Sequence, residues 1–181
     1  MGKEQTIVKN SNAMQGFGSM DILCVDKTGT LTGDKITLEY YLDILGNESR
    51  KVLDLAYLNS LYHTSVQNHL DDAVLQYREM PGRADYCRKL AQEHPKLDEI
   101  PFDHERKVAS VLVQGQESNL LILKGSLAQV YRRCRYVEYK GERREIGPRD
   151  RAGVHAVVDE MLEDGMKVLA VACKPTEQRR V

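Results

Sequence analysis

The order of apolar patterns along the chain is the feature that most limits its fold. Helical spacing of apolar residues predicts helices over residues 52–60, 71–80, 84–92, 127–134 and 150–164. The apolar runs Val108–Val113 and Leu120–Leu123 predict a β-hairpin, and residues 137–146 predict a second one. Helices and hairpins are interspersed without a steady β-α-β rhythm. We therefore expect an α+β fold with a mostly antiparallel, twisted sheet flanked by helices.

Three further segments have the patterns of strands. Strict alternation of apolar residues from Ile36 to Ile44 predicts a half-buried strand, and Met166–Cys173 predicts a last strand that ends before Pro175. Ile22–Val25 is a short continuous apolar run, which is typical of a strand buried on both faces. Because this run stands apart from the other elements, we expect it to be the first strand of a different structural unit.

The balance of charge excludes one class of partner. Lys and Arg together number 26 and Asp and Glu number 27, which gives a net charge of −1. This balance removes the usual electrostatic argument for nucleic-acid binding, so no nucleic-acid partner is expected. Charged or polar residues interrupt every apolar stretch before about 18 residues, so we expect a chain that does not span a membrane. A local excess of Lys and Arg over residues 124–151 is interpreted as a solvated surface, or alternatively as a positive rim near a polyphosphate.

Asp26 is the first candidate for chemistry. It directly follows the apolar run, and open sheets present reactive groups at the carboxyl ends of their strands. An aspartate can act as a nucleophile that forms an aspartyl phosphate. Lys27 can neutralise charge, and Thr28 can donate hydrogen bonds to phosphate oxygens. On residue types alone, a Thr/Gly turn capped by Asp is the favoured explanation of these residues.

The string Asp26-Lys27-Thr28-Gly29-Thr30-Leu31-Thr32 is identical to the phosphorylation motif of the P-type ATPases, ion pumps that pass through an aspartyl-phosphate intermediate. The chain resembles that family over about residues 10–174. The resemblance implies that Asp26 is the phosphorylated nucleophile and that Thr28 lies beside the phosphate. Asp26 and Thr28 would then contact Mg²⁺ together with the phosphate, in the intact pump.

Four later segments resemble the nucleotide-binding domain of the same pumps. Leu70–Leu75 is similar to a helix whose carboxylate faces the nucleotide, which implies that role for Asp71. Ile100–Lys107 is similar to a segment whose Phe stacks on adenine, which implies that Phe102 stacks and that Lys107 binds nucleotide.

The other two segments would supply further contacts. Lys124-Gly125-Ser126 resembles a Lys-Gly-Ala segment whose Lys reaches the nucleotide. In Gly165–Ala170, Lys167 replaces the more usual Arg and cannot reproduce a bidentate Arg contact. Whether His104 or Arg106 contacts the nucleotide is left open by the sequence.

The residues themselves are compatible with this site but do not require it. Phe102 offers an aromatic face, and the predicted hairpin would place Lys107 and Lys124 on one surface. Taken singly, Phe102 is a typical core residue, Lys124 a typical surface lysine, and Asp71 a typical charge at a helix N-terminus. Their order behind the phosphorylation motif favours the functional interpretation.

Two downstream segments that the family needs, Thr-Gly-Asp and Gly-Asp-Gly-x-Asn-Asp, are not found at the expected places. We therefore interpret the chain as a cytoplasmic piece of a pump, soluble by itself and located at the inner face of a bacterial membrane in the intact protein. The expected parts are a polar leader (1–20), a stub of the phosphorylation domain (21–34), a nucleotide-binding domain (35–174) and a tail toward the phosphorylation domain (175–181).

The expected function follows from this organisation. The chain would bind ATP or ADP without turnover, and ATP with Mg²⁺ would phosphorylate Asp26 only in the intact pump, whose phosphorylation, actuator and membrane domains are the implied partners. Residues 12–24 and 55–60 look most like bacterial magnesium-transporting P-type ATPases. A non-catalytic nucleotide-sensing module is one alternative. An aspartate-nucleophile phosphatase is another, but it would need an acid/base group where Thr28 stands.

Overall fold

The computed structural model describes residues 16, 19–22, 24, 36–65, 68–139 and 141–181. The chain divides into two compact units, residues 1–34 and residues 35–181. The helices and strands named below belong to the second unit. In the residues that the structure describes, no helix is both long and apolar enough to cross a membrane.

Four antiparallel strands form the main sheet of the second unit, in the order β1-β2-β3-β6. Their bounds are Lys96–Asp103 for β1, Val108–Val113 for β2, Asn119–Gly125 for β3 and Ala170–Thr176 for β6. A separate two-stranded sheet consists of β4 (Tyr136–Tyr139) and β5 (Glu142–Glu145). The expected α+β class with an antiparallel sheet is confirmed.

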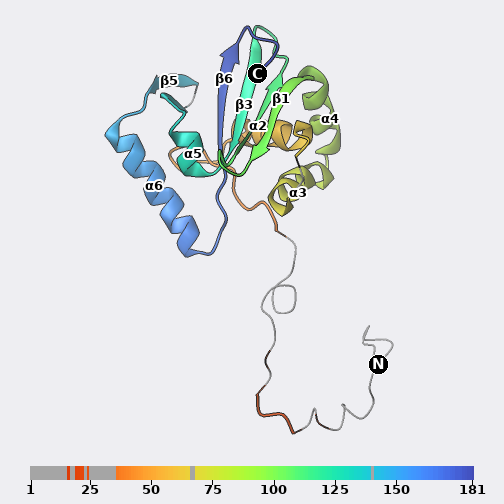
Figure 1. Ribbon diagram of the computed structural model, residues 1–181, viewed down its shortest axis with the longest axis vertical. Coiled ribbons are helices and arrows are strands. Elements are labelled where there is room, and N and C mark those ends of the chain that lie inside the picture. The colour runs from red at the N-terminus through yellow and green to blue at the C-terminus, as the bar shows by residue number, and fades with distance from the viewer. Residues whose placement is uncertain (1–15, 17–18, 23, 25–35, 66–67, 140) are drawn as a thin grey trace. The chain divides into compact units, whose positions relative to one another are not determined.

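Helices surround the main sheet. In chain order they are α2 (Arg50–Tyr62), α3 (His69–Leu75), the short 3₁₀ helix η2 (Gln76–Glu79), α4 (Ala84–Glu93), α5 (Leu127–Tyr131) and α6 (Pro148–Glu163). In Figure 1, α3 and α4 lie towards the β1 side of the sheet, and α5 and α6 lie towards the β6 side. Helix α2 packs across the sheet and contacts β2, β3 and β6.

The core lies between α2 and the sheet. Leu55 and Leu58 of α2 pack against buried side chains of β2 and β3, chiefly Val111, Val113 and Ile122. A second cluster joins α2 to α3, η2 and α4, and its buried members are Leu53, Tyr57, Val74, Tyr77 and Cys87. Strand β2 is buried along its whole length. The sheet and α2 therefore form a rigid support for the polar residues at their ends.

The helices and hairpins that the sequence predicts are present, with shifted ends. The stretch predicted over 71–80 divides into α3 and η2, and the one predicted over 127–134 ends at Tyr131. Helix α6 ends as expected: Asp164 is its C-cap, and Gly165 follows in the left-handed region with φ 77°. Glycine is favoured there because it has no side chain to clash with the backbone.

The prediction of a strand over Ile36–Ile44 is wrong, because this segment forms no strand. A strand needs a neighbouring strand to accept its backbone hydrogen bonds. Within the described residues this segment pairs only through a bridge between Leu42 and Glu48, across a turn in which Gly46 has φ 83°. Its apolar side chains instead pack individually, as Leu38 does against the cluster beneath α2.

The structure also corrects the predictions for the two edge strands of the sheet, β1 and β6. Strand β1 was not predicted, because charged residues and Pro101 interrupt its apolar pattern; an edge strand tolerates them, since one of its sides is unpaired. Strand β6 begins at Ala170 rather than at residue 166, and it includes Pro175. Of the predicted strand Ile22–Val25 the structure describes Ile22 and Cys24, which are exposed and lie outside any strand; the other two residues lie outside the described part.

Candidate functional site

The turn between β1 and β2 carries two of the predicted site residues. Phe102, near the end of β1, is 40% exposed, and its ring meets the ring of His104 edge-on at 5.3 Å. The exposure rules out the alternative that Phe102 is a core residue. Lys107 is exposed and has φ 52°, in the left-handed region that non-glycine residues rarely adopt. Its backbone N–H donates to the carbonyl of Asp103 at 2.6 Å.

Asp103 fixes the shape of this turn, and sequence reasoning missed it. Its Oδ1 accepts hydrogen bonds from the backbone N–H groups of Glu105 at 2.6 Å and Arg106 at 3.1 Å. These bonds to the ionised form hold the pKa of Asp103 below its ordinary value. An Asp that is followed by polar residues between two strands is a known turn signal, so the role could have been inferred from the sequence.

Gly125 allows β3 to approach the same turn closely. Val108 pairs with Gly125 in the register of β2 and β3. A Cβ on Gly125 would lie 2.2 Å from the carbonyl oxygen of Lys107, far inside van der Waals contact. The same carbonyl accepts a hydrogen bond from the N–H of Ser126 at 3.2 Å. Glycine is therefore required here by packing, and its place joins the Lys-Gly-Ser segment to the turn that bears Lys107.

Asp71 and Lys124 lie buried together. Asp71 is 3% exposed at the start of α3, and Lys124 is 5% exposed on β3. The Lys124 ammonium donates to both Oδ1 of Asp71 and Oγ of Ser60, and Ser60 donates to the same Oδ1 at 3.0 Å. Nε2 of His63 faces the other oxygen, Oδ2, at 3.1 Å. Lys124 is thus not a surface lysine.

The electrostatics of this cluster keep both charges. Burial alone would raise the pKa of Asp71, but the neighbouring His63 and the Lys124 ammonium outweigh it and hold that pKa well below its ordinary value. Burial lowers the pKa of Lys124, and the Asp71 carboxylate partly offsets that effect. A carboxylate that is ionised beside an ammonium gives a net charge of zero for the pair.

The connection between α2 and α3 ties this buried cluster to β1. The hydroxyl oxygen of Ser65 accepts a hydrogen bond of 2.6 Å from the N–H of Phe102. The N–H of Thr64 donates to Glu99 at 2.8 Å, and the Thr64 hydroxyl donates to the same carboxylate. The cluster and the exposed ring of Phe102 are therefore held by one short segment, residues 63–65. These contacts cross 35 or more positions of sequence and could not have been found from local patterns.

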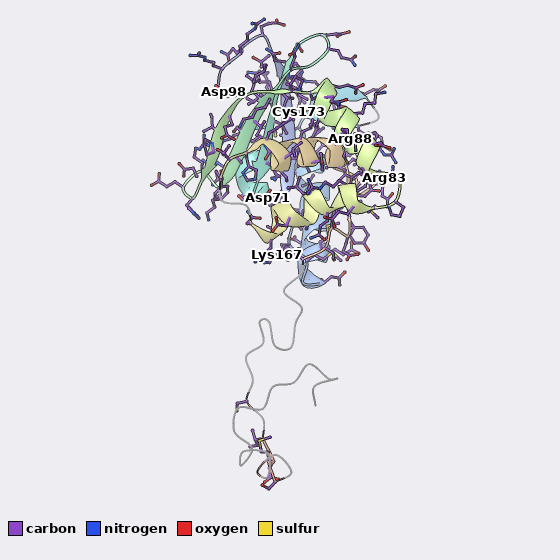
Figure 2. The ribbon with its side chains drawn as sticks, turned by 90° about the vertical axis from the view of Figure 1, so that its right-hand side faces the viewer. Asp71, Arg83, Arg88, Asp98, Lys167 and Cys173 are labelled. Carbon is purple, nitrogen blue, oxygen red and sulfur yellow. The ribbon has the colours of Figure 1, made fainter. Side chains whose placement is uncertain are left out.

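Of the remaining predicted residues, the structure describes Lys167 but not those of the phosphorylation motif. Lys167 is exposed and precedes β6, whose first residue, Ala170, pairs with Gly125. Figure 2 shows Asp71 and Lys167 towards one end of the domain, and Asp98 and Cys173 towards the other. Asp26, Lys27 and Thr28 lie outside the described residues.

A large cavity reaches this end of the sheet. Its volume is about 1590 Å³, and Arg106, Lys124 and Lys167 line it together with apolar side chains such as Leu123 and Val158. Phe102, Lys107 and Asp71 are not among its lining residues. Arg106 also donates to the carbonyl of Pro101 at 3.2 Å, which places it beside Phe102. Among the described residues, no group of three or more His, Cys, Asp or Glu side chains could hold a metal ion.

Comparison with known proteins gives consistent matches. The model of the family described as "P-type ATPase, cytoplasmic domain N" matches residues 58–181. The chain is 43% identical over 175 residues to the Magnesium-transporting ATPase, P-type 1, of Escherichia coli (strain K12), which covers 96% of this chain and 19% of that relative. The protein of the same name from Salmonella typhimurium (strain LT2) is 43% identical over 176 residues, again 96% of this chain and 19% of the relative.

A more distant match is the Calcium-transporting ATPase 1 of Lactococcus lactis subsp. lactis, which is 27% identical over 197 residues. That alignment covers 99% of this chain and 22% of the relative. The chain therefore spans about a fifth of the length of the curated relatives that it matches.

Proposed function

Because the chain belongs to the family of the cytoplasmic N domain of P-type ATPases, we propose that residues 35–174 bind ATP or ADP as the nucleotide-binding domain of a larger ion-transporting ATPase. The observation that carries the proposal is the meeting of separate segments at one end of the sheet. The turn that bears Phe102 and Lys107 touches the backbone of Gly125, and Lys167 approaches the same end through β6.

The geometry suits a nucleotide in two respects. The exposed ring of Phe102 offers a face on which a base can stack. Lys107 and Lys167 are exposed ammonium groups, and Arg106 and Lys167 line the adjoining cavity, so positive charge is available for phosphate oxygens. Asp71 and Lys124 act from beneath this surface, where each needs the other as its partner.

Residues 21–34 would supply the chemistry in the intact pump, as part of its phosphorylation domain, and residues 1–20 would be a leader to it. Residues 175–181, of which the first two still belong to β6, would lead back toward that domain. Asp26 is the phosphate acceptor, with Lys27 and Thr28 beside it. A carboxylate and a hydroxyl are oxygen donors, the type that Mg²⁺ prefers, so Asp26 and Thr28 fit a magnesium ion that accompanies the phosphate. Phosphoryl transfer depends on positioning and on neutralised charge, which is what Mg²⁺ supplies when it is bound.

The transported ion is proposed to be magnesium, since two of the relatives named above are magnesium-transporting ATPases with 43% identity. The ATPase would act at the inner face of a bacterial membrane, with its phosphorylation, actuator and membrane domains as partners of this chain. A non-catalytic nucleotide-sensing module is the second candidate, because the exposed Phe102 ring and the exposed Lys107 and Lys167 could bind a nucleotide without turnover. A phosphatase is disfavoured by Thr28, which cannot act as an acid/base group.

Titration of ¹⁵N-labelled chain with ATP tests nucleotide binding. A site with one stacking ring and separate cations should bind with a dissociation constant of roughly 0.1–5 mM. We expect amide shifts around residues 71, 100–107, 124–126 and 167 that saturate with ATP and ADP. A spectrum that is unchanged at 10 mM ATP in these regions would refute the proposal.

Labelling with γ-phosphate tests the role of Asp26. The intact ATPase that contains this chain should form an acid-stable, hydroxylamine-labile phosphoenzyme that disappears in Asp26→Asn. The isolated chain should remain unlabelled while it still binds ATP. A label that persists in Asp26→Asn would assign the phosphate to another residue.

A further inference from the structure

His63 is a buried imidazole beside the ion pair of the proposed nucleotide site. Its side chain is 3% exposed, and Nε2 lies 3.1 Å from Oδ2 of Asp71. Among the described residues, the other ring nitrogen, Nδ1, has no hydrogen-bond partner. Buried polar groups are almost always hydrogen-bonded, so an imidazole placed this way calls for an explanation.

Each carboxylate oxygen of Asp71 faces a different basic side chain. Oδ1 accepts from the Lys124 ammonium and from Ser60, whereas Oδ2 faces His63. The charged groups near the ring are Asp71 from α3, with Lys124 of β3 bound to it. Strand β1 adds Glu99, which binds Thr64, and Lys96, which binds the carbonyl of Tyr62; these two form an ion pair with each other. While the ring is neutral, the cluster of one carboxylate and one ammonium is neutral as a whole.

A proton on His63 would change this balance. The cluster would carry one net positive charge, and the imidazolium would compete with Lys124 for the Asp71 carboxylate. Both effects favour an anion bound nearby: the site gains charge, and the hold of Asp71 on the buried Lys124 ammonium is weakened. Imidazole is the side chain that changes its charge between about pH 5 and 8.

We propose that His63 is a positioning residue of the nucleotide site, which sets how firmly Asp71 holds Lys124 and makes the affinity for nucleotide phosphates depend on pH. The inference rests on the proposed function, since it concerns the same site. The structural link is short: His63 is two residues from Ser65, whose hydroxyl accepts the N–H of Phe102. Movement of the His63 segment would therefore also reach the stacking ring.

The test compares the parent chain with His63→Gln, which keeps a polar side chain but removes the titration. Dissociation constants for ATP, AMP and adenosine are measured from pH 5.5 to 8. Nucleotide phosphates titrate in the same range, so the informative quantity is the ratio of variant to parent at each pH. His155→Gln, an exposed position on α6, is the matched control.

For ATP, the ratio should be near one at pH 8 and should rise about three- to fivefold at pH 5.5, as expected for one partly screened charge. The rise should be smaller for AMP and absent for adenosine and for His155→Gln. A flat ratio for ATP would overturn the inference while leaving the proposed function intact. A parent chain that binds no ATP at any pH would overturn the proposed function, and this inference with it.

Reciprocity supplies a second measurement, which does not depend on the stability of the variant. If a proton on His63 favours ATP, then ATP must favour the proton by the same factor. The imidazole resonances of the parent chain, followed against pH with and without saturating ATP, should show one ring whose titration moves to higher pH, and this ring should be His63. A His63 curve that ATP leaves unchanged would overturn the inference, whatever the curves of the other four histidines show.

Discussion

Lys124 and Asp71 neutralise each other inside the domain, 53 positions apart in the sequence, with Ser60 bound to both. Lys124 is 5% exposed, so its side chain belongs to the interior of the domain as well as to the predicted site. Substitution of either residue therefore tests stability before it tests binding.

Lys124→Met should lower the free energy of unfolding by about 3–5 kcal/mol, because it leaves the Asp71 carboxylate buried without its cation. The double variant Asp71→Leu/Lys124→Met, which removes both charges, should recover much of that loss. Urea unfolding of the two variants and of the parent measures the difference. A double variant that is less stable than Lys124→Met would contradict this account of the pair.

The same pair predicts a pH dependence of stability. The pKa of Asp71 is lowered in the folded chain, so its contribution is fully present above the ordinary aspartate pKa of about 3.9 and is lost as the pH falls further. The stability difference between the parent and Asp71→Asn should therefore shrink below about pH 4. Asp85→Asn, an exposed position on α4, is the control. Urea midpoints from pH 7 to 3 measure both differences, and a gap that stays constant to pH 3 would argue against the lowered pKa.

Phe102→Ala should weaken binding without unfolding the chain. The ring is 40% exposed, so little core packing is lost. Loss of base stacking should cost about 1–3 kcal/mol, to a similar extent for ATP, ADP and AMP and at low and high salt. Leu97→Ala is the matched control, since Leu97 is a 37% exposed apolar residue of the same strand. A folded Phe102→Ala chain that binds ATP as well as the parent would remove the ring from the site.

Lys107 combines an exposed charge with a strained backbone, and the two can be separated. Lys107→Gly should raise the free energy of unfolding by about 1 kcal/mol, since glycine adopts φ 52° without strain. It should nevertheless weaken ATP binding, and the loss should diminish as salt screens the missing charge. Lys107→Asn, which also tolerates this conformation, should bind ATP like the glycine variant. Restored ATP affinity in Lys107→Asn would contradict a charge-based role.

Gly125→Ala should lower the free energy of unfolding by about 1–3 kcal/mol, because the new Cβ would meet the carbonyl oxygen of Lys107 at 2.2 Å. The same substitution at Gly153, inside α6 with nothing near its Cβ, should raise stability by about 0.5–1 kcal/mol. Thermal unfolding of the two variants compares them directly. Equal effects at the two sites would show that the close approach at Gly125 is relaxed at little cost.

Some elements could be predicted from local sequence because they satisfy their own hydrogen bonds. Helices α2, α4 and α6 have an apolar stripe of helical period and form over nearly the predicted residues. Strands do not have this independence. The alternating segment from Ile36 to Ile44 forms no strand for want of a partner, whereas β1 is a strand despite its charges because β2 pairs with it.

The candidate site shows the same division. The resemblance to a known family predicts Phe102, Lys107 and Lys124 as site residues from residue type and order. It could not indicate that Lys124 is buried, because burial depends on Ser60 and Asp71 from other elements. The anchoring of Phe102 by Ser65, across 37 positions, likewise depends on the fold as a whole.

The two prolines of the main sheet affect how it meets other molecules. β1 and β6 are the outermost strands, and they carry Pro101 and Pro175. A proline has no N–H to offer to an approaching chain, so each border lacks one link of the ladder that would extend the sheet. Each proline thus disfavours edge-to-edge pairing of the sheet with another chain. Replacement of either proline is expected to increase aggregation in concentrated solution.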